Sequence, residues 1–394
     1  MKITKLVALF LIIAAAGMVC NPALSETDKS QILRVAIVDD KSSVSISLKG
    51  RYKISALSSG KTVLEGPYLI KTVTAANGGI KIGNTSTGAR GIRIKTARDG
   101  DVYVDSRRFR GDVDVIRKDN GKLLVINNIS VEDYLYGVLY HEVSHRWPAE
   151  CLKAQAIVSR TFALYQARQN KQQPYDLRCD IYSQVYGGKA SEKWSTTKAV
   201  DSTRGKILTY KGDILPAYFH ATCGGHTEDA SNLWNIDLAP LKGVECGYCD
   251  RSKHYKWINK IPLARVEAKL KEAGYDIGGI VSVSVLSKNA SGRADKIEIK
   301  DGAGVTVIIA AKDFRQMMGP NDVRSTKFDA SVHGAELVLD GFGWGHGVGM
   351  CQWGAFGMSE KGKKAEEILK FYYPGTEVTT IDRFALSSRA KLRT

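Results

Sequence analysis

After its first 25 residues, the 394-residue sequence has no apolar run approaching the roughly 20 residues that a membrane-spanning helix needs. We therefore expect no permanent membrane span. Internal repeats and low-complexity tracts are also missing, so the sequence is typical of a globular protein. Its length allows two or three packed units. It has no compact basic run, no recognition-helix pattern and no RNA-binding aromatic motif, and we expect no nucleic-acid partner.

The first 25 residues have the pattern of a signal peptide. Lys2 and Lys5 give a positive start, residues 6–19 form an apolar core, and Ala23-Leu24-Ser25 is a small-residue cleavage site. We predict a signal peptide at 1–25 and an exported protein that resides in the periplasm or the cell wall.

The formal charge of the chain is +16, from 57 Lys and Arg residues against 41 Asp and Glu residues. An excess of this size attracts polyanions over long distances. For an exported protein the favoured partners are anionic cell-wall polymers, and the alternative is that the basic surface only confers solubility.

Six cysteines follow the predicted leader: Cys151, Cys179, Cys223, Cys246, Cys249 and Cys351. Outside the cytoplasm an even number favours disulfides, whose connectivity the sequence does not reveal. Cys223 and His226 form a C-x-x-H pair, and Cys246 and Cys249 form a C-x-x-C pair, a set that suits a structural tetrahedral zinc ion. Zinc and disulfides both remain open.

The pattern of the chain predicts an α+β fold. Short alternating segments split by Gly, Asn and Asp indicate a β-rich N-terminal domain at 26–128. A mixed α/β catalytic region is predicted at 129–394, with a core at 129–250, a β-rich segment at 275–340, and a glycine-rich motif and final helix at 341–376.

The catalytic region is predicted to begin with a helical hairpin. Ser130 and Asp133 form a capping-box start ahead of apolar residues at helical spacing. The first helix must stop near Trp147-Pro148, and Pro148 is well placed to open a second helix that runs to about Gln169. Further on we predict a helix at 190–202, a strand at 206–210 and a short helix at 365–373.

Glu142 interrupts the apolar stripe of the first predicted helix, which contains Leu135, Val138, Leu139 and Val143. Burial disfavours a charged carboxylate and raises its pKa. A carboxyl that stays protonated near neutral pH can protonate a leaving glycosidic oxygen. The alternative is an inert Glu142 paired with Arg146 or Lys153.

A competing motif occupies the same residues. His141-Glu142-Val143-Ser144-His145 matches H-E-x-x-H, in which two histidines one helical turn apart bind zinc and the glutamate activates water. This interpretation predicts a zinc metalloprotease. Pro148 breaks the helix early, and the glycine and histidine that continue the longer metzincin form of this motif do not follow.

Several segments, in order along the chain, resemble the stage II sporulation protein D and amidase-enhancer (LytB) family of peptidoglycan-acting proteins. They begin at Val131-Glu-Asp-Tyr-Leu-Tyr-Gly-Val with Glu142, Trp147-Pro148 and the segment from Leu152 to Leu164. They continue with Ser183-Gln-Val-Tyr-Gly-Gly, residues 217–228, Ser291-Gly-Arg, Phe314-Arg315, the glycine-rich residues 343–355 and Phe371-Tyr-Tyr-Pro-Gly-Thr.

The resemblance implies a lytic transglycosylase that cleaves glycan strands lacking stem peptides, with Glu142 as general acid and base and no cofactor required for catalysis. It also places Lys153 and Arg160 near the substrate, where either cation would bind the lactyl carboxylate of muramic acid. Plain ion pairing is their alternative role.

Five further positions in the matching segments are candidates for substrate binding: Gln184, His220, Thr227, His346 and Gln352. For the glycine-rich motif, a structural tight turn is an equal alternative. Some relatives hold zinc through a Cys and a His-Cys pair before the Gln-containing segment, and this chain keeps Cys179 without that histidine, so we do not expect that site.

A different function class remains open beside the enzyme. The chain could be a non-catalytic amidase enhancer or wall-binding module, partnered by an N-acetylmuramoyl-L-alanine amidase, and Glu142 would then be dispensable. The two functions differ in whether anhydro-ended glycan products form.

Overall fold

The structure is a computed structural model, and it describes residues 31–97, 100–180 and 184–384. The predicted signal peptide at 1–25 lies outside these described residues. Within them, no helix combines the length and the apolar character that crossing a membrane requires.

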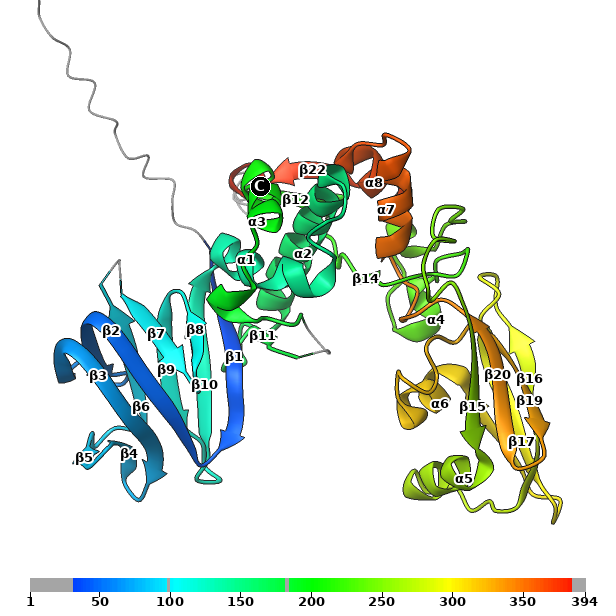
Figure 1. Ribbon diagram of the computed structural model, residues 1–394, viewed down its shortest axis with the longest axis horizontal. Helices are drawn as coiled ribbons and strands as arrows, with labels where there is room; N and C mark the ends of the chain where they lie inside the picture. Colours follow the sequence, from blue (N-terminus) through cyan, green and yellow to red (C-terminus); the bar gives the residue numbers. More distant parts are fainter. Residues whose placement is uncertain (1–30, 98–99, 181–183, 385–394) are drawn as a thin grey trace, which may run out of the picture. The chain divides into compact units, whose positions relative to one another are not determined.

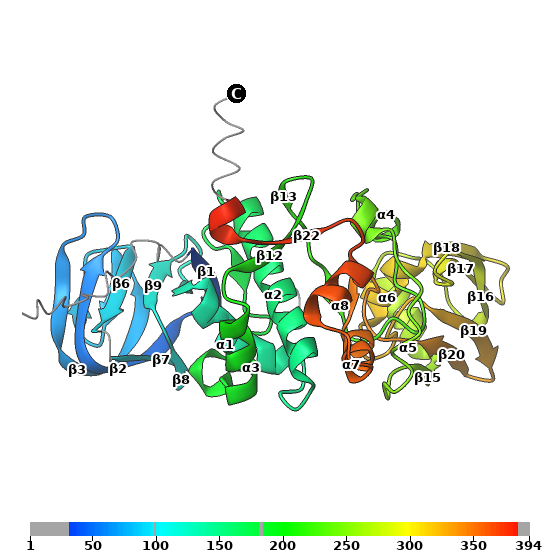
Figure 2. The ribbon, with the colours of Figure 1, turned by 90° about the horizontal axis from the view of Figure 1, so that it is seen from above.

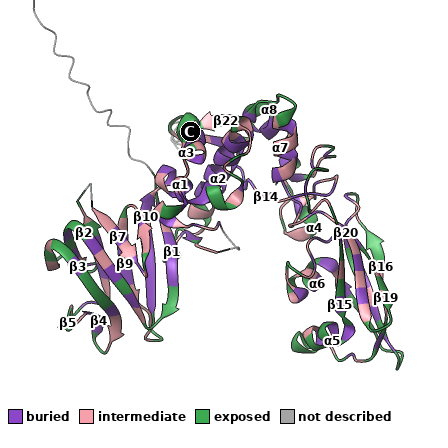
Figure 3. Cartoon of the chain, viewed as in Figure 1, coloured by how far each residue is buried: buried purple, intermediate pink, exposed green. Residues whose placement is uncertain are grey.

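The N-terminal region is a β-sheet, as predicted. Its strands are β1 (Ile32–Lys41), β2 (Ser43–Ala56), β3 (Thr62–Ala76), β4 (Gly79–Ile82), β5 (Thr85–Ser86), β6 (Gly91–Thr96), β7 (Asp101–Val104), β8 (Arg107–Phe109), β9 (Asp112–Arg117) and β10 (Leu123–Ser130) (Figure 1). The main strand order is β11-β1-β10-β9-β6-β2-β3-β4-β5, and β11 (Leu177–Arg178) joins the edge parallel to β1. Ile92 and Ile94 of β6 are fully buried, while Arg93 between them is half-buried and Lys95 after them is exposed, which is the period-2 pattern of a half-buried strand. Buried and exposed residues are mixed along the strands of this sheet (Figure 3).

The predicted helical hairpin is present as α1 (Val131–Glu142) and α2 (Ala149–Gln169). The side chain of Ser130 accepts a hydrogen bond from the backbone N–H of Asp133 at 3.1 Å and so caps α1. Pro148 immediately precedes α2, as expected from its fixed φ and missing N–H. The register of the hairpin therefore follows from local capping chemistry.

The predicted strand at 206–210 is confirmed as β12 (Lys206–Tyr210), which pairs with β13 (Asp213–Ile214) and with β22 (Glu377–Thr380) near the C-terminus (Figure 2). Where one helix was predicted at 190–202, the chain forms the short 3-10 helix η1 (Gly188–Ser191) and then α3 (Trp194–Ser202). The final predicted helix is α8 (Ala365–Tyr372).

The remaining elements mix strands and short helices. They are β14 (Phe219–His220), α4 (Ala230–Leu233), η2 (Ala239–Leu241), β15 (Lys256–Pro262), α5 (Leu263–Glu272), β16 (Ile280–Lys288), β17 (Ala294–Asp301), β18 (Thr306–Ala310), α6 (Ala311–Met318), β19 (Phe328–His333), β20 (Glu336–Phe342), β21 (Met350–Cys351) and α7 (Gln352–Glu360). Two three-stranded sheets form, β15-β20-β19 and β16-β17-β18. The β-rich prediction at 275–340 missed α6, while α5 lies before that segment, where no element was predicted. Each of the two helices buries only a narrow apolar stripe.

The parallel pair β14 and β21 brings together segments that lie far apart in the sequence, with Phe219 opposite Met350 and His220 opposite Cys351. The glycines of the motif before β21 allow this close approach. A Cβ on Gly345, which has a φ of +113°, would lie 2.8 Å from the Cβ of His220 in β14. This pairing fixes where α7 begins, and α7 carries one of the residues that contact Glu142.

Candidate active site around Glu142

Glu142 is the last residue of α1. The next residue, Val143, is extended, with φ −141° and ψ 154°, so the chain leaves the helix directly after the carboxylate. The C-terminal end of a helix carries a partial negative charge that disfavours a second negative charge beside it. Position alone therefore favours the protonated form of Glu142.

The Glu142 side chain is half-buried, and burial raises its pKa from an ordinary value of 4.5 to about 7. A side-chain hydrogen bond from Gln352 acts in the opposite direction and lowers the pKa of Glu142. Among the described residues, no cation forms an ion pair with Glu142. The alternative of an inert pair with Arg146 or Lys153 is not realised, because Arg146 is exposed and Lys153 pairs with Glu150 at 2.8 Å.

Gln352 contacts both helices of the hairpin, Glu142 on α1 and Gln155 on α2. Its amide Nε2 lies 3.4 Å from Oε1 of Gln155, and the amide of Gln155 donates to the hydroxyl of Ser159 at 3.0 Å. Gln155 and Ser159 both lie on α2 and are fully buried. The amide of Gln352 is therefore anchored to the second helix of the hairpin while it contacts the acid on the first.

An aromatic cluster supports the same contact. The rings of Trp147 and Trp353 meet edge to face at 5.1 Å, and Phe356 lies 5.1 Å from Trp147 and 5.3 Å from Trp353. Trp147 belongs to the turn that follows Glu142, and Trp353 follows Gln352. Packing of this turn on α7 thus holds Glu142 and Gln352 at a fixed separation.

Gln184 reaches the site through Tyr134. The Tyr134 hydroxyl donates to Oε1 of Gln184 at 3.2 Å, and both side chains are buried. Burial, and after it the nearby charge of Glu142, raises the pKa of Tyr134 well above its usual range. A Cβ on Gly137 would lie 2.6 Å from the ring of Tyr186, so this glycine allows the segment of Gln184 to pack against α1.

Lys153 and Arg160 differ in their availability to a ligand. Lys153 keeps 33% of its side chain exposed, and its one ion-pair partner among the described residues is Glu150 in its own helix. Arg160 is fully buried, and the five N–H groups of its guanidinium donate to both carboxylate oxygens of Glu132 at 2.9 and 2.7 Å and to the carbonyl oxygens of Lys206, Val200 and Ala156. Contrary to the prediction, Arg160 has no free donor for a substrate carboxylate, and its alternative role in ion pairing holds.

Thr227 also uses its hydrogen bonds within the fold. It is 1% exposed, and its hydroxyl exchanges hydrogen bonds with the backbone N–H and carbonyl of Val244 at 2.7 and 3.3 Å. These contacts join the loop of Thr227 to the loop of Val244. They do not fit the prediction that Thr227 binds a sugar.

His220 and His346 form a separate pair with ring centroids 5.6 Å apart, in which His220 is buried and His346 is half-buried. His220 Nδ1 lies 3.1 Å from the carbonyl oxygen of Val348, and Nδ1 of His346 accepts from the N–H of the same valine. Burial, aided by the positive charge of Arg315, lowers the pKa of His346 to about 3, so this ring is neutral. In the described part of the chain neither histidine has a hydrogen bond to Glu142.

The H-E-x-x-H interpretation fails on geometry. Because α1 ends at Glu142, His141 and His145 do not lie one turn apart on a helix. Nε2 of His141 lies 2.7 Å from the hydroxyl of Ser191, and the ring of His145 packs 5.6 Å from that of Tyr140. Among the described residues these histidines do not form part of a metal-ligand cluster.

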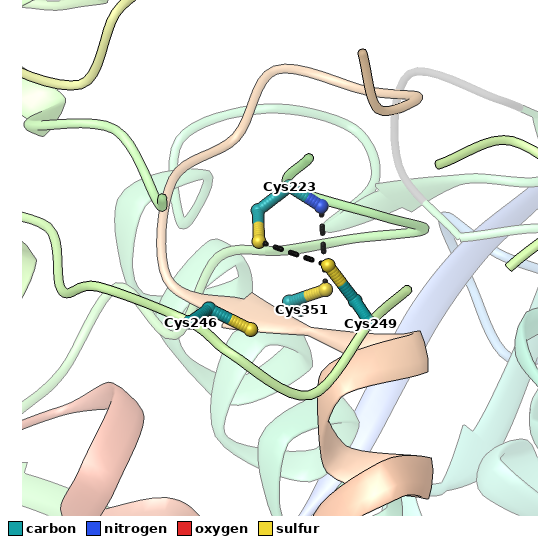
Figure 4. Close-up of side chains that lie close together, drawn as sticks. All are labelled: Cys223, Cys246, Cys249 and Cys351. Atoms are coloured by element: carbon teal, nitrogen blue, oxygen red, sulfur yellow. Dashed lines mark hydrogen bonds between the residues drawn. The ribbon is translucent and has the colours of Figure 1, made fainter. Parts of the chain in front are cut away.

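Four cysteines do form such a cluster. The Sγ atoms of Cys223, Cys246, Cys249 and Cys351 all lie within 4.8 Å of one another, and all four residues are buried (Figure 4). Their fourth member is Cys351, where the spacing suggested His226. His226 instead places its Nδ1 2.6 Å from the carbonyl oxygen of Thr227.

The sequence interpretation missed two contributors to the site of Glu142, namely Tyr134 and Gln155. Tyr134 gave no signal, because an aromatic residue four positions before Val138 on the apolar stripe of α1 looks like any core residue. Gln155 offered one signal, a polar residue between alanines on the buried face of α2. Such buried amides need a partner, and here the partner is Gln352.

Comparisons with known proteins match two parts of the chain. The family model described as "Stage II sporulation protein" matches residues 119–210, which include α1, α2 and Glu142. A second model, "Domain of unknown function (DUF8618)", matches residues 241–349.

Three relatives illustrate the range of similarity. An uncharacterised protein of Brachyspira hyodysenteriae is 35% identical over 89% of this chain and 94% of its own length. Stage II sporulation protein D of Bacillus subtilis is 32% identical over 68% of this chain and 79% of its own length. The amidase enhancer of Bacillus subtilis is 27% identical over 62% of this chain and 40% of its own length. By its sequence match and by the segment that carries Glu142, the chain belongs to the stage II sporulation protein D family.

Proposed function

We propose that the protein is a peptidoglycan lytic transglycosylase that cleaves glycan strands lacking stem peptides. The observation that carries the proposal is Glu142, a half-buried carboxyl at the C-terminal end of a helix, with a pKa raised to about 7 and no ion-pair partner among the described residues. A group with this pKa is divided between acid and base forms near neutral pH, which suits proton transfer in both directions.

The reaction needs one proton donor that afterwards becomes a proton acceptor. As an acid, Glu142 gives its proton to the oxygen that joins muramic acid C1 to glucosamine, and the C1–O bond breaks. As a base, the resulting carboxylate takes the proton from the primary hydroxyl on C6 of the same muramic acid, and O6 bonds to C1. The products are a free glucosamine end and a 1,6-anhydro end, Glu142 regains its proton, and no water is consumed.

Gln352 and Lys153 have supporting roles in this proposal. The hydrogen bond from Gln352 orients the carboxyl and partly offsets the effect of burial on its pKa. Lys153 follows Glu142 across the hairpin turn and retains a partly exposed side chain, whose ammonium group would bind the lactyl carboxylate that muramic acid presents once its peptide is gone.

Export and cell-wall location belong to the same proposal. They rest on the signal-peptide pattern at 1–25 and on the formal charge of +16, which attracts anionic wall polymers. A protein that cleaves glycan strands must reach them outside the cytoplasm.

The test is mass spectrometry of products from peptide-free glycan strands. The wild-type protein should release anhydro-ended fragments, and Glu142→Gln should reduce their formation at least about 100-fold while the fold is retained, because an amide cannot exchange the proton. Release of fragments with reducing ends would show hydrolysis and contradict the transglycosylase assignment. Arg146→Gln is the matched control, since Arg146 is exposed on the same turn and should leave the rate unchanged.

The similarity to an amidase enhancer supports a second candidate function, a non-catalytic activator that binds the wall and an N-acetylmuramoyl-L-alanine amidase. In that case glycan strands would bind without product, an amidase would release stem peptides faster in the presence of the protein, and Glu142→Gln would stimulate as well as the wild type. The two functions are therefore separated by the same variant.

A further inference from the structure

The four-cysteine cluster is assembled from three distant segments. Cys223 follows β14, Cys246 and Cys249 share one loop, and Cys351 ends β21. Each Sγ atom lies within 4.8 Å of the other three, and each residue is 2% exposed or less. Four thiolates around one zinc ion at a Zn–S distance of about 2.3 Å form a tetrahedron with edges of about 3.8 Å. The observed cluster, with 3.5 Å between the Sγ atoms of Cys223 and Cys249 and no separation above 4.8 Å, is close to that size. The four side chains gather around one point (Figure 4).

We propose that Cys223, Cys246, Cys249 and Cys351 bind a single structural zinc ion as four thiolates. The closed, all-cysteine donor set is that of structural zinc sites, which leave no position open for substrate. This site does not contain Glu142 and is separate from the proposed proton transfer.

Hydrogen bonds to the sulfur atoms support thiolates. Sγ of Cys351 accepts from the backbone N–H groups of Cys223 and Gly354, both at 3.3 Å. Sγ of Cys246 lies 3.1 Å from the hydroxyl of Tyr372, and the backbone N–H of Gly225 donates to Sγ of Cys249. Such outer contacts orient metal-bound thiolates and spread their negative charge.

The positive charges next to the cluster also favour thiolates. Arg293 is fully buried and donates from Nη2 to the carbonyl oxygen of Cys223 at 2.9 Å, and Lys327 donates to the carbonyl oxygen of Gly224 at 2.9 Å. The carboxylate near Arg293 belongs to Glu228, 3.7 Å away, and accepts other hydrogen bonds as well. Four thiolates and one Zn²⁺ carry a net charge of −2, which would compensate the two cations.

The arrangement fits zinc better than two disulfides. The Sγ atoms of Cys223 and Cys249 are 3.5 Å apart, well beyond the roughly 2.05 Å of a disulfide bond. Among the described residues all six cysteines are free. A disulfide carries no charge, so two of them would leave Arg293 with the carboxylate of Glu228 as its one ion-pair partner among the described residues, and Lys327 without the compensation that thiolates give.

A zinc ion here would also act on the site of Glu142. Cys351 directly precedes Gln352, whose side chain bonds Glu142. Fixing Cys351 to the loops of Cys223 and Cys246 therefore fixes the start of α7. This consequence rests on the proposed function, whereas zinc binding itself does not.

The experiment is metal analysis of the full chain recovered from its exported location without reducing agents or chelators. We expect about one zinc per chain, four thiols protected from alkylation until the protein is unfolded with a chelator, and at least about tenfold weaker zinc binding in Cys249→Ser. Cys179→Ser is the matched control and should keep its zinc, because Cys179 lies outside the cluster and donates to the carbonyl of Tyr186.

A second measurement does not depend on a variant that folds. Exchange of the bound metal for Co²⁺ in the wild-type protein should give the intense charge-transfer bands and visible bands of a tetrahedral four-sulfur site. Absence of metal together with disulfide-linked peptides, iron in place of zinc, or loss of zinc from Cys179→Ser would overturn the proposal. Glu142→Gln should retain full zinc content, so failure of the proposed function would be seen separately.

Discussion

The two ends of α1 each carry a glutamate, and the two acids have opposite surroundings. Glu132, in the first turn, is buried and forms a bidentate ion pair with the fully buried Arg160. Its carboxylate also accepts a hydrogen bond from the backbone N–H of Gly205 at 3.0 Å. Glu142, in the last turn, accepts a hydrogen bond from the uncharged amide of Gln352 and has no cation as partner within the described ranges. The helix dipole favours a negative charge at the first end and disfavours it at the second.

The comparison shows that burial alone does not make a proton-transferring acid. Glu132 is buried more deeply than Glu142, yet every partner around it stabilises the carboxylate. Glu142 combines partial burial with the absence of a cation among the described residues. A glutamate that stabilises the hairpin and one that suits catalysis thus occur on one helix, and their partners make the difference.

The largest expected effect on stability comes from the first end of α1. Glu132→Gln leaves Arg160 charged and buried without a counterion, and we expect a loss of about 3–5 kcal/mol in the free energy of unfolding, measured by urea denaturation. The matched control is Glu366→Gln, which removes an exposed pair with Lys206 and should cost less than about 1 kcal/mol. Equal losses in both variants would remove the contrast between buried and exposed pairs.

At the other end, the raised pKa of Glu142 makes stability depend on pH. The folded protein holds this proton up to about pH 7, whereas the unfolded chain releases it near pH 4.5. The contribution of protonated Glu142 to the free energy of unfolding is therefore present below pH 4.5 and lost as the pH rises to about 7. In thermal unfolding experiments, the wild type should lose stability relative to Glu142→Gln as the pH rises from 4.5 to about 7. Above pH 7 the difference in stability between the two proteins should stay constant. A constant difference across the whole window would contradict the raised pKa. Glycan cleavage, which needs the protonated acid first, should fall above about pH 7.

A smaller effect is expected for Lys153. Lys153→Gln should raise KM for peptide-free glycan by roughly tenfold with little change in kcat, because a charge-assisted hydrogen bond contributes about 1.5–3 kcal/mol and water replaces part of it. Lys206→Gln removes another partly exposed cation and serves as the control. An unchanged KM in Lys153→Gln would assign this lysine to its pair with Glu150 alone.

The smallest effect is predicted for the histidine in the turn after α1. His145→Ala should change glycan cleavage less than about twofold, because His145 packs on Tyr140 and has no place in a metal cluster among the described residues. Steady-state rates near neutral pH provide the measurement. A loss comparable to that of Glu142→Gln would revive the metal-assisted interpretation of this segment.

Much of the fold could be predicted because its signals are local. Ser130 and Asp133 mark the start of α1, Pro148 marks the start of α2, and the alternation in β6 marks a half-buried strand. The helix α6 was missed because it is short and lies within the segment predicted as β-rich, where the tertiary packing of a few apolar residues decides the element, and no element was predicted where α5 lies.

The candidate site was predicted in part for the same reason. Glu142 stood out because a charged residue on an apolar stripe can be recognised within one helix. Gln155, Tyr134 and the role of Cys351 depend on partners far along the chain, and spacing placed His226 in the sulfur cluster although its ring turns to the carbonyl of Thr227.

The sequence by itself determined which residue is the candidate acid, where the hairpin begins and turns, and that the N-terminal region is a sheet. Capping, proline geometry and hydrophobic periodicity act over a few residues, so patterns along the chain reveal them. Only the tertiary structure decided that Arg160 neutralises Glu132 and that Gln352 faces Glu142. Charge pairing and burial are set by atoms a few ångströms away in space that can be hundreds of positions away in the chain.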